Sequence, residues 1–366
     1  MEKTSSLNVL SLFDGISCGQ IAIKKAGFEI ESYTAYEIDK YAIAITRKNY
    51  PKTEQKGDVL SANFKEHKNI DLIIAGSPCT TWSIAKNNRE KDKSGTGWHL
   101  FMQFAKAIKT INPKYYLYEN VSSMPKTIKD YISQELNTEP IKINSALVSP
   151  QQRNRYYWTN IAKTNNSFKT MPNIPHPEDK GILLKDIIDH SVAPTASKTT
   201  QPITLKDEST CKCATNYKRN PNQLIKKKCF CEMVIHKAPE RIGQIGKGGQ
   251  GERIYSVNGK SVTISANGGG GGAKTGLYKI DFPDGNYIIR SLTPKEAERC
   301  QTIPDDYTAT GTDENGKTII ISNTQRYKII GNGWTIDVIA HILKHIHPSG
   351  NEVIPDITLT KGGTHP

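Results

Sequence analysis

The sequence predicts an α/β fold with a mostly parallel sheet, helices on both faces, and a second, smaller, loop-rich domain. Over the first third of the 366 residues, apolar strand-like runs alternate with helical patterns, and turn residues separate them. Such alternation is typical of parallel sheets, whose ligands bind at the carboxyl ends of the strands. From about residue 164 to residue 285, Gly, Pro, Lys and Asn become frequent, which favours a separate loop-rich domain.

The N-terminal elements follow from local patterns. Apolar runs followed by turn residues predict strands over residues 7–13, 31–39, 70–76 and 114–120. Apolar residues at helical spacing predict helices over residues 20–28, 40–51 and 99–111. Gly27 and Pro51 end the first two of these helices, because glycine accepts the left-handed conformation and proline lacks an N–H.

The later elements are expected to be shorter. In the loop-rich region, the sequence pattern predicts short strands over residues 253–257 and 260–265. A helix over residues 293–301 has Thr293 as its N-cap and Pro294 at its first position. An amphipathic helix over residues 335–346 follows a turn predicted at residues 330–334. We therefore assign residues 1–163 and 325–366 to a catalytic domain and residues 164–324 to the second domain.

Composition limits the class of protein. The formal net charge is +13, and residues 206–260 carry 12 Lys and Arg against 5 Asp and Glu, a net +7. This excess favours a polyanionic partner, although a solvated basic surface would have the same composition. We expect a soluble, cytoplasmic protein, because the chain has neither an apolar run of roughly 20 residues nor a secretory signal. An odd count of seven cysteines favours reduced thiols.

The first predicted strand ends in a glycine turn, "FDGISCG", with Gly15 and Gly19. This spacing is not the G-x-G-x-x-G fingerprint that holds a pyrophosphate at a helix N-terminus. Glu37 lies where an open α/β sheet places the acid that binds ribose hydroxyls. Together these features favour an adenosine-type ligand without phosphates, and S-adenosyl-L-methionine is the obvious candidate.

A second group of residues lies at neighbouring strand ends. Cys79, in "GSPC", follows one buried strand, and Glu119 ends another. Arg153 and Arg155 come from "QQRNR". A thiol beside positive charge can act as a nucleophile. The residues alone leave open a structural cysteine with a surface Glu–Arg pair.

The ordered motifs resemble the DNA (cytosine-5)-methyltransferase family. They are "VLSLFDGISCG", "YEIDKYA", "GDV", "DLIIAGSPCTTWSIA", "YLYENV", "VSPQQRNRYYWTN", "RSLTPKEAERCQTIPDDY" and "IIGNGWT". They span residues 9–335 and look closest to the branch of the animal de novo enzymes and related phage and bacterial enzymes. Ser11 and the pair Gly333–Trp334 depart from the pattern of many bacterial members. The resemblance implies a Rossmann-like methyltransferase fold with a target-recognition domain.

The resemblance also implies a mechanism. Cys79 would attack C6 of a flipped-out cytosine, and Glu119 would bind N3 and the exocyclic amine. Arg153 and Arg155 would lie near the base and the catalytic loop, with Arg155 the better candidate for contacting the pyrimidine oxygen. C5 would take the methyl group from S-adenosyl-L-methionine. Implied cofactor contacts are Phe13, Asp14, Gly15, Glu37, Ile38, Asp58, Val59, Pro78, Asn332 and Trp334. Implied contacts to duplex DNA are Ser83, Arg241, Lys247, Arg253 and Lys274.

Some expectations stay open at this point. Cys211, Cys213, Cys229 and Cys231 could bind zinc, but their C-x-C spacing is not the usual C-x₂-C, so no metal is assigned. An RNA cytosine methyltransferase and a catalytically silent DNA-binding regulator are the alternative functions, and a nicotinamide enzyme is remote. The sequence does not identify the DNA site, a cognate restriction endonuclease or the oligomeric state.

Overall fold

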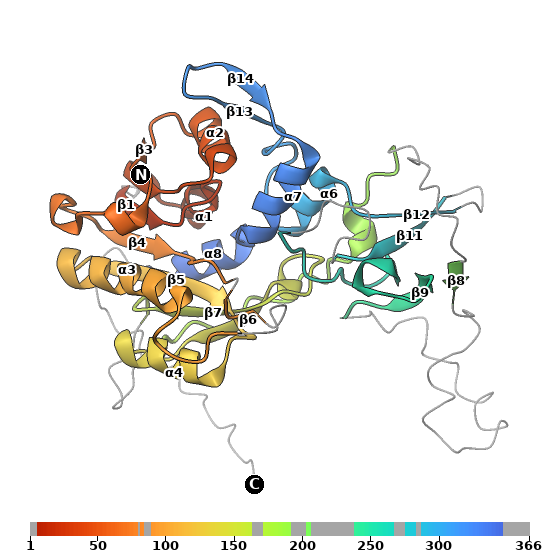
Figure 1. Cartoon of the computed structure of the whole chain (residues 1–366), viewed down its shortest axis with the longest axis horizontal. Coiled ribbons are helices and arrows are strands. Elements are labelled where there is room, and N and C mark those ends of the chain that lie inside the picture. The colour runs from red at the N-terminus through yellow and green to blue at the C-terminus, as the bar shows by residue number, and fades with distance from the viewer. Residues whose placement is uncertain are drawn as a thin grey trace, which may run out of the picture.

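The computed structural model describes residues 6–79, 81–83, 89–162, 171–191, 203–205, 238–266, 275–282 and 287–346. Its larger sheet has seven strands in the order β3-β2-β1-β4-β5-β7-β6 (Figure 1). The strands are β1 (Ser6–Leu12), β2 (Glu29–Tyr36), β3 (Glu54–Gln55), β4 (Leu72–Ala75), β5 (Tyr115–Val121), β6 (Ile141–Asn144) and β7 (Asn154–Thr159). Only β7 runs against its neighbours, so the predicted mostly parallel sheet is confirmed.

Seven α-helices are present in the described residues. They are α1 (Cys18–Ala26), α2 (Lys40–Asn49), α3 (Thr96–Ile111), α4 (Lys126–Glu135), α6 (Pro294–Cys300), α7 (Asn323–Asn332) and α8 (Ile336–Leu343). The predicted stop of α1 at Gly27 is confirmed by its φ of 96°. The predicted cap of α6 is also confirmed: the Thr293 hydroxyl accepts from Glu296 N, and the Glu296 carboxylate accepts from Thr293 N. None of these helices is long and apolar enough to cross a membrane.

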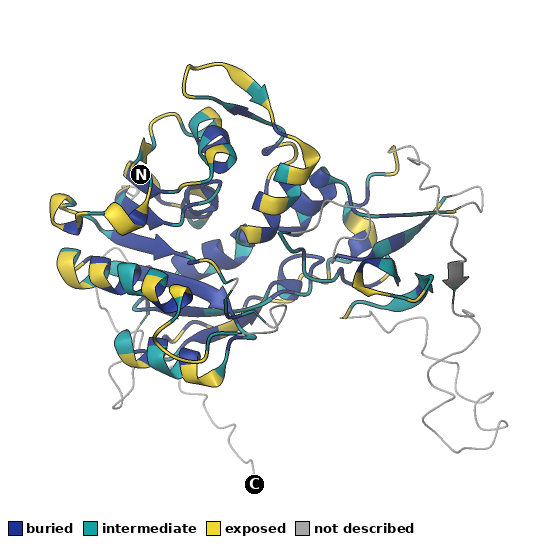
Figure 2. Cartoon of the chain, in the orientation of Figure 1, coloured by how far each residue is buried: buried dark blue, intermediate teal, exposed yellow. Residues whose placement is uncertain are grey.

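Alternate side chains of the central strands fill two separate cores. On β4, Leu72 and Ile74 pack with α1 and α8, whereas Ile73 and Ala75 pack with α3 and α4 on the opposite face. All four are fully buried, as the dark strands in Figure 2 show. A strand buried on both faces has no polar positions, which explains the continuous apolar run in the sequence.

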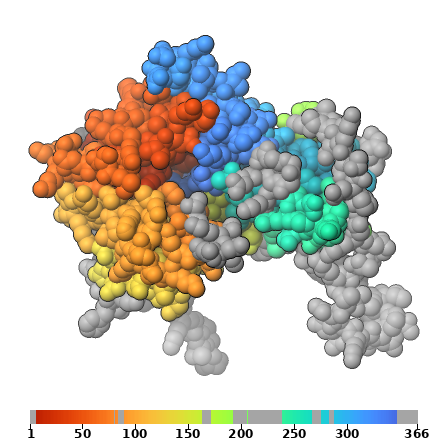
Figure 3. Space-filling model, in the orientation of Figure 1, coloured from red at the N-terminus to blue at the C-terminus, as the bar shows by residue number. Residues whose placement is uncertain are grey.

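A second sheet forms the other side of the molecule (Figures 1 and 3). Its order is β12-β11-β10-β9-β8, from β8 (Ile203–Leu205), β9 (Arg241–Ile245), β10 (Arg253–Ser256), β11 (Leu277–Asp281) and β12 (Tyr287–Arg290). The strand predicted at residues 253–257 is therefore present. Later residues of the predicted range 164–324 contact the larger sheet's helices, because Gly311 of β13 (Thr310–Thr312) lies against Ala44 of α2.

Three local predictions were wrong or incomplete. The turn predicted at residues 330–334 is mostly helix, since α7 continues to Asn332. Residues 260–265 do not join the second sheet; instead Ser261 bridges to Gln151, which lies shortly before β7 of the larger sheet. Several elements were missed, among them α4, β6, β7, α7, β13 and β14 (Thr318–Ile320). Most of the missed elements are short or polar, so their patterns are weak and tertiary packing stabilises them.

One buried carboxylate connects the stretch of chain that leads into the second sheet with the stretch that leaves it. Glu296 is fully buried, and its oxygens accept from Arg290 Nη1 and Nη2 at 2.7 and 2.8 Å. The same carboxylate accepts from Asp189 N at 2.9 Å. Arg290 lies at the end of the second sheet and Asp189 lies before its first strand. Because the ion pair is buried, removing either partner would leave an uncompensated charge.

Candidate active site

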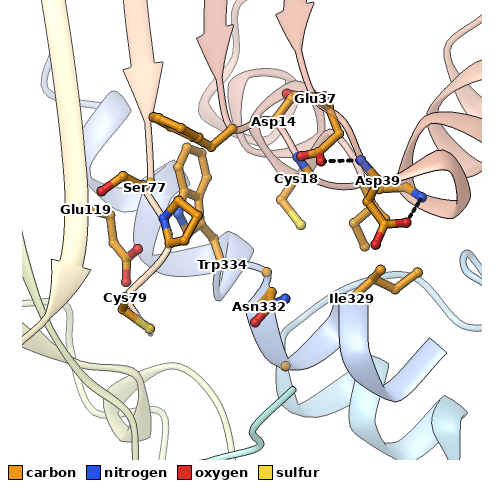
Figure 4. Close-up of a pocket in the computed structure, with 18 of the residues that line it drawn as sticks. Asp14, Cys18, Glu37, Asp39, Ser77, Cys79, Glu119, Ile329, Asn332 and Trp334 are labelled. Atoms are coloured by element: carbon orange, nitrogen blue, oxygen red, sulfur yellow. Dashed lines mark hydrogen bonds between the residues drawn. The ribbon is translucent and has the colours of Figure 1, made fainter. Parts of the chain in front are cut away.

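A cavity of about 200 Å³ opens at the carboxyl ends of β1, β2, β4 and β5. The end of α7 and the turn before α8 form its opposite wall, with Ile329, Asn332 and Trp334 (Figure 4). Glu37 and Asp39 line one end of it, and Cys79 and Glu119 line the other. Groups predicted to bind a cofactor and groups predicted to act on a substrate therefore share one cavity.

The Glu37 carboxylate is held by backbone donors. One oxygen accepts from Gly15 N at 2.7 Å, and the other accepts from Ile38 N and Asp39 N, both at 2.8 Å. Gly15 has a φ of 61°, which favours glycine at this turn. These bonds fix the acid in the cavity wall directly after β2, where the sequence placed it.

Asp14 is a buried carboxyl beside this turn. It accepts from the Tyr33 hydroxyl at 2.6 Å and from the Ser17 hydroxyl at 2.5 Å. Burial raises the pKa of Asp14 to about 6, and the two hydroxyl donors oppose that rise. The cofactor end of the cavity thus contains one carboxyl group that titrates near neutral pH.

The turn that carries Cys79 rests on a buried polar network. The Ser77 and Tyr118 hydroxyls lie 2.6 Å apart, and Asn120 Nδ2 donates to the Ser77 carbonyl at 3.1 Å. After the turn, Trp82 N and Ser83 N donate to the Cys79 carbonyl at 3.0 and 2.9 Å. Bonds on both sides of Cys79 restrict the orientations of its thiol.

Glu119 and Arg155 form an ion pair beside Cys79. The distance from Arg155 Nε to Glu119 Oε1 is 2.8 Å, and the two side chains are only 12% and 11% exposed. Adjacent antiparallel strands bring them together, because Val121 of β5 pairs with Arg155 of β7. Burial raises the pKa of the Cys79 thiol, the Arg155 charge opposes that rise, and the Glu119 charge adds to it.

Arg153 lies in the cavity wall but has other partners. Its guanidinium donates to the carbonyls of Ile264 at 3.0 Å, Gly331 at 3.2 Å and Gly333 at 2.8 Å. Burial lowers the pKa of Arg153 to about 10, so the group stays charged at neutral pH. In the described residues Arg153 therefore bonds to backbone carbonyls, whereas Arg155 bonds to the carboxylate of Glu119.

The structure brings most of the predicted site residues together. The cavity is lined by Phe13, Asp14, Gly15, Glu37, Pro78, Cys79, Glu119, Arg153, Arg155, Asn332 and Trp334. Three predicted cofactor residues are not among its lining. Ile38 is 73% exposed, Asp58 caps the short helix that starts at Val59, and Val59 is buried in the core.

Sequence reasoning missed other lining residues, including Cys18, Asp39, Ser77 and Ile329. Asp39 had a detectable signal, because it lies two residues after Glu37 and caps α2 through Tyr41 N and Ala42 N. Ile329 had none, since only the path of α7 brings it to the cavity.

The residues predicted to contact DNA lie apart from the cavity lining. Arg241 of β9 donates to the Gln244 side chain and the Gly243 carbonyl, and Arg253 begins β10. Lys247 is exposed in the turn between them. Lys274 and the four cysteines considered for zinc lie outside the described residues. Within the described ranges, no cluster of three or more His, Cys, Asp or Glu could hold a metal ion.

Curated relatives match most of the chain in sequence. The "Type II methyltransferase M.HhaI" of Haemophilus parahaemolyticus is 29% identical over 361 residues, covering 96% of this chain and 97% of the relative. The "Orphan methyltransferase M.SPRI" of Bacillus phage SPR is 28% identical and matches 72% of this chain and 65% of its own length.

Solved structures agree on the fold. The Entamoeba histolytica methyltransferase EhMeth aligns with a TM-score of 0.63 at 16% identity, covering 94% of this chain and 98% of that one. The S. pombe Dnmt2 methyltransferase aligns with a TM-score of 0.59 at 14% identity, covering 93% and 98%.

The family model described as C-5 cytosine-specific DNA methylase matches residues 7–348. This match includes both sheets and every lining residue of the cavity. The expected methyltransferase fold and family are thereby confirmed: the chain belongs to the C-5 cytosine-specific DNA methylases, a family of enzymes.

Proposed function

We propose that this enzyme transfers a methyl group from S-adenosyl-L-methionine to C5 of cytosine in a specific sequence of duplex DNA. The observation that carries the proposal is the single cavity lined at one end by Glu37 and at the other by Cys79 and Glu119. A methyl donor and a target base bound at these two ends would meet inside it.

The catalytic end suits nucleophilic addition to a pyrimidine. The Cys79 thiolate would form a bond to C6, and the electron pair of the C5–C6 double bond would make C5 nucleophilic. Glu119 would hydrogen-bond N3 and the exocyclic amine, which stabilises the ring as electron density shifts. After C5 is methylated, loss of the C5 proton restores the double bond and expels the Cys79 thiolate.

Arg155 supports this chemistry in two ways. Its positive charge opposes the effect of burial on the pKa of Cys79, which favours the thiolate. It also holds Glu119 in place through the 2.8 Å ion pair. A base inside a duplex is shielded by stacking and pairing, so the target cytosine would have to be flipped out.

The other end of the cavity suits an adenosine group with a sulfonium side chain. The fixed Glu37 carboxylate can accept from ribose hydroxyls, and the exposed apolar side chain of Ile38 lies beside it. Asp14 and Asn332 are further polar groups that line the cavity, and the methionine part would bind near them. When bound, S-adenosyl-L-methionine supplies an electrophilic methyl group.

The second sheet is the proposed target-recognition domain. Arg241 and Arg253 begin two neighbouring strands, and Lys247 is exposed in the turn that joins them. The net charge of +13 favours phosphate contacts along this part of the protein. Duplex DNA is accordingly the proposed substrate.

The test is methyl transfer from tritiated S-adenosyl-L-methionine to unmethylated duplex DNA, followed by bisulfite sequencing. Label on cytosines with the unaltered protein, and none with Cys79→Ala, would support the proposal and reveal the target sequence. Cys300→Ala is the matched control, because it removes a buried thiol that does not line the cavity and should keep the same labelled cytosines.

Competition between labelled duplex DNA and transfer RNA separates the alternatives. Transfer to RNA alone would identify an RNA methyltransferase. DNA binding without transfer to either substrate would identify a silent regulator. Transfer to duplex DNA that excess transfer RNA does not suppress is the result we expect.

A further inference from the structure

A buried polar network joins four segments that are distant in the sequence. Gln151 donates to the side chain of Gln301 at 3.1 Å and accepts from Ile264 N at 2.8 Å. Gln301 in turn donates to the carbonyls of Ile330 and Gly333 at 2.9 and 3.1 Å. The network therefore links the segment before β7, the segment after β10, the end of α6, and the junction between α7 and α8.

Two of these segments belong to different functional parts. We call residues 261–266 the recognition segment, because they lie in the chain between β10 of the second sheet and Lys274, an implied DNA contact. We call residues 331–334 the cofactor turn, because all four line the cavity. The two segments are in direct backbone contact: a Cβ atom added at Gly331 would lie only 2.3 Å from the Ser265 carbonyl carbon.

Arg153 spans this contact. One guanidinium nitrogen donates to Ile264 in the recognition segment, and the other donates to Gly331 and Gly333 in the cofactor turn. The residue is only 3% exposed. A planar guanidinium that bonds to three carbonyls fixes their relative positions, which a flexible ammonium group does less well.

We propose that Arg153 is a positioning residue that couples DNA binding to cofactor binding. When the recognition segment is fixed in position by DNA, the bonds of Arg153 would also fix the position of the cofactor turn. This inference rests on the proposed function and deepens it, since it assigns Arg153 a role different from the base contact implied by its motif.

The physical basis is linkage between two sites. A ligand that orders the recognition segment reduces the entropy that the second ligand loses when it orders the cofactor turn, provided that the two segments move together. The coupling must then be reciprocal: DNA strengthens cofactor binding by the same factor by which the cofactor strengthens DNA binding.

The experiment measures binding of S-adenosylhomocysteine, the demethylated cofactor, by calorimetry with and without saturating DNA. The probe is a short synthetic duplex centred on the cytosine mapped by bisulfite sequencing. For the unaltered protein we expect affinity to rise about tenfold with DNA, within the usual range of coupling between sites. For Arg153→Lys we expect less than about a twofold rise with DNA, measured relative to that variant's own DNA-free affinity, because lysine keeps the charge but not the three-way bond.

Lys260→Met is the matched control. Lys260 is another buried cation, and its ammonium donates to the carbonyls of Ala146, Ser149 and Ile182, none of which lies in the cofactor turn. This variant should lose thermal stability but keep the tenfold rise. Gly331→Ala serves as a second test, since its added methyl group would separate the two segments and should also reduce the rise.

Several results would overturn the inference. One is an undiminished rise with DNA in both Arg153→Lys and Gly331→Ala. Another is a loss of coupling in Lys260→Met as large as that in Arg153→Lys, which would indicate that destabilising the fold is enough to remove the coupling. No effect of DNA on cofactor affinity in the unaltered protein would also refute it. Failure to methylate any DNA would instead refute the proposed function, and the inference would fall with it.

Discussion

Replacing the buried carboxyl of Asp14 by an amide should change how stability depends on pH. The pKa of Asp14 is raised from 3.8 to about 6 by burial. The folded state therefore holds its proton more tightly than the unfolded state does. The stabilisation that results is complete below about pH 4 and is lost as pH rises through about 6.

The magnitude follows from the shift. A difference of about two pKa units corresponds to about 3 kcal/mol, since each unit is about 1.4 kcal/mol. Asp14→Asn carries no charge at any pH, and its amide oxygen can still accept from the Tyr33 hydroxyl. Relative to the unaltered protein, the variant should thus gain about 3 kcal/mol in free energy of unfolding between about pH 4 and pH 7.

The assay is urea unfolding of both proteins across this pH range, with the difference between their free energies plotted against pH. Tyr33→Phe is an informative companion, because it removes the 2.6 Å hydrogen bond that opposes the raised pKa. Its pH dependence should be steeper than that of the unaltered protein. A difference curve for Asp14→Asn that is flat within about 1 kcal/mol would refute the reasoning.

Three further outcomes are expected. Glu119→Gln should lower kcat by about 10²- to 10⁴-fold in the methyl-transfer assay, as loss of a positioned acid–base group does; a kcat near that of the unaltered enzyme would remove Glu119 from the mechanism. The rate at which iodoacetamide alkylates Cys79, followed by peptide mass mapping, should increase as pH rises. The rate should be lower in Arg155→Met, because the charge that lowers the thiol pKa is lost. Equal rates in the two proteins would contradict this role of Arg155. Gly311→Ala should lower the free energy of unfolding in urea by about 1–3 kcal/mol, because the added Cβ would lie 2.8 Å from Ala44. An unchanged midpoint of urea unfolding would show that the β13–β14 hairpin can shift to make room for the methyl group.

Part of the site could be predicted because neighbouring parallel strands end at one edge of a sheet. Glu37 follows β2, Cys79 follows β4 and Glu119 lies in β5, so their proximity follows from strand order. Asn332 and Trp334 could be assigned only through the resemblance to a family. Nothing in the local pattern of α7 indicates that its last turn faces the cavity.

Arg153 and Arg155 illustrate the limit of sequence reasoning. From the resemblance both arginines were expected near the base, with Arg155 the better candidate for a contact to it, and no partner within the chain could be assigned to either. In the structure Arg155 pairs with Glu119, whereas Arg153 bonds to carbonyls 111, 178 and 180 residues away. The partners of a long side chain depend on which distant segments pack around it, and no local pattern encodes that.

The sequence by itself determined the fold class, the family and the groups at the strand ends, because hydrophobic periodicity and short motifs are local properties of the chain. Only the tertiary structure decided that Glu296 connects the chain that leads into the second sheet with the chain that leaves it. It also decided that the recognition segment packs on the cofactor turn. Both arrangements depend on buried polar groups finding partners far along the chain. Burial without such partners is costly, so the complete packed structure selects them.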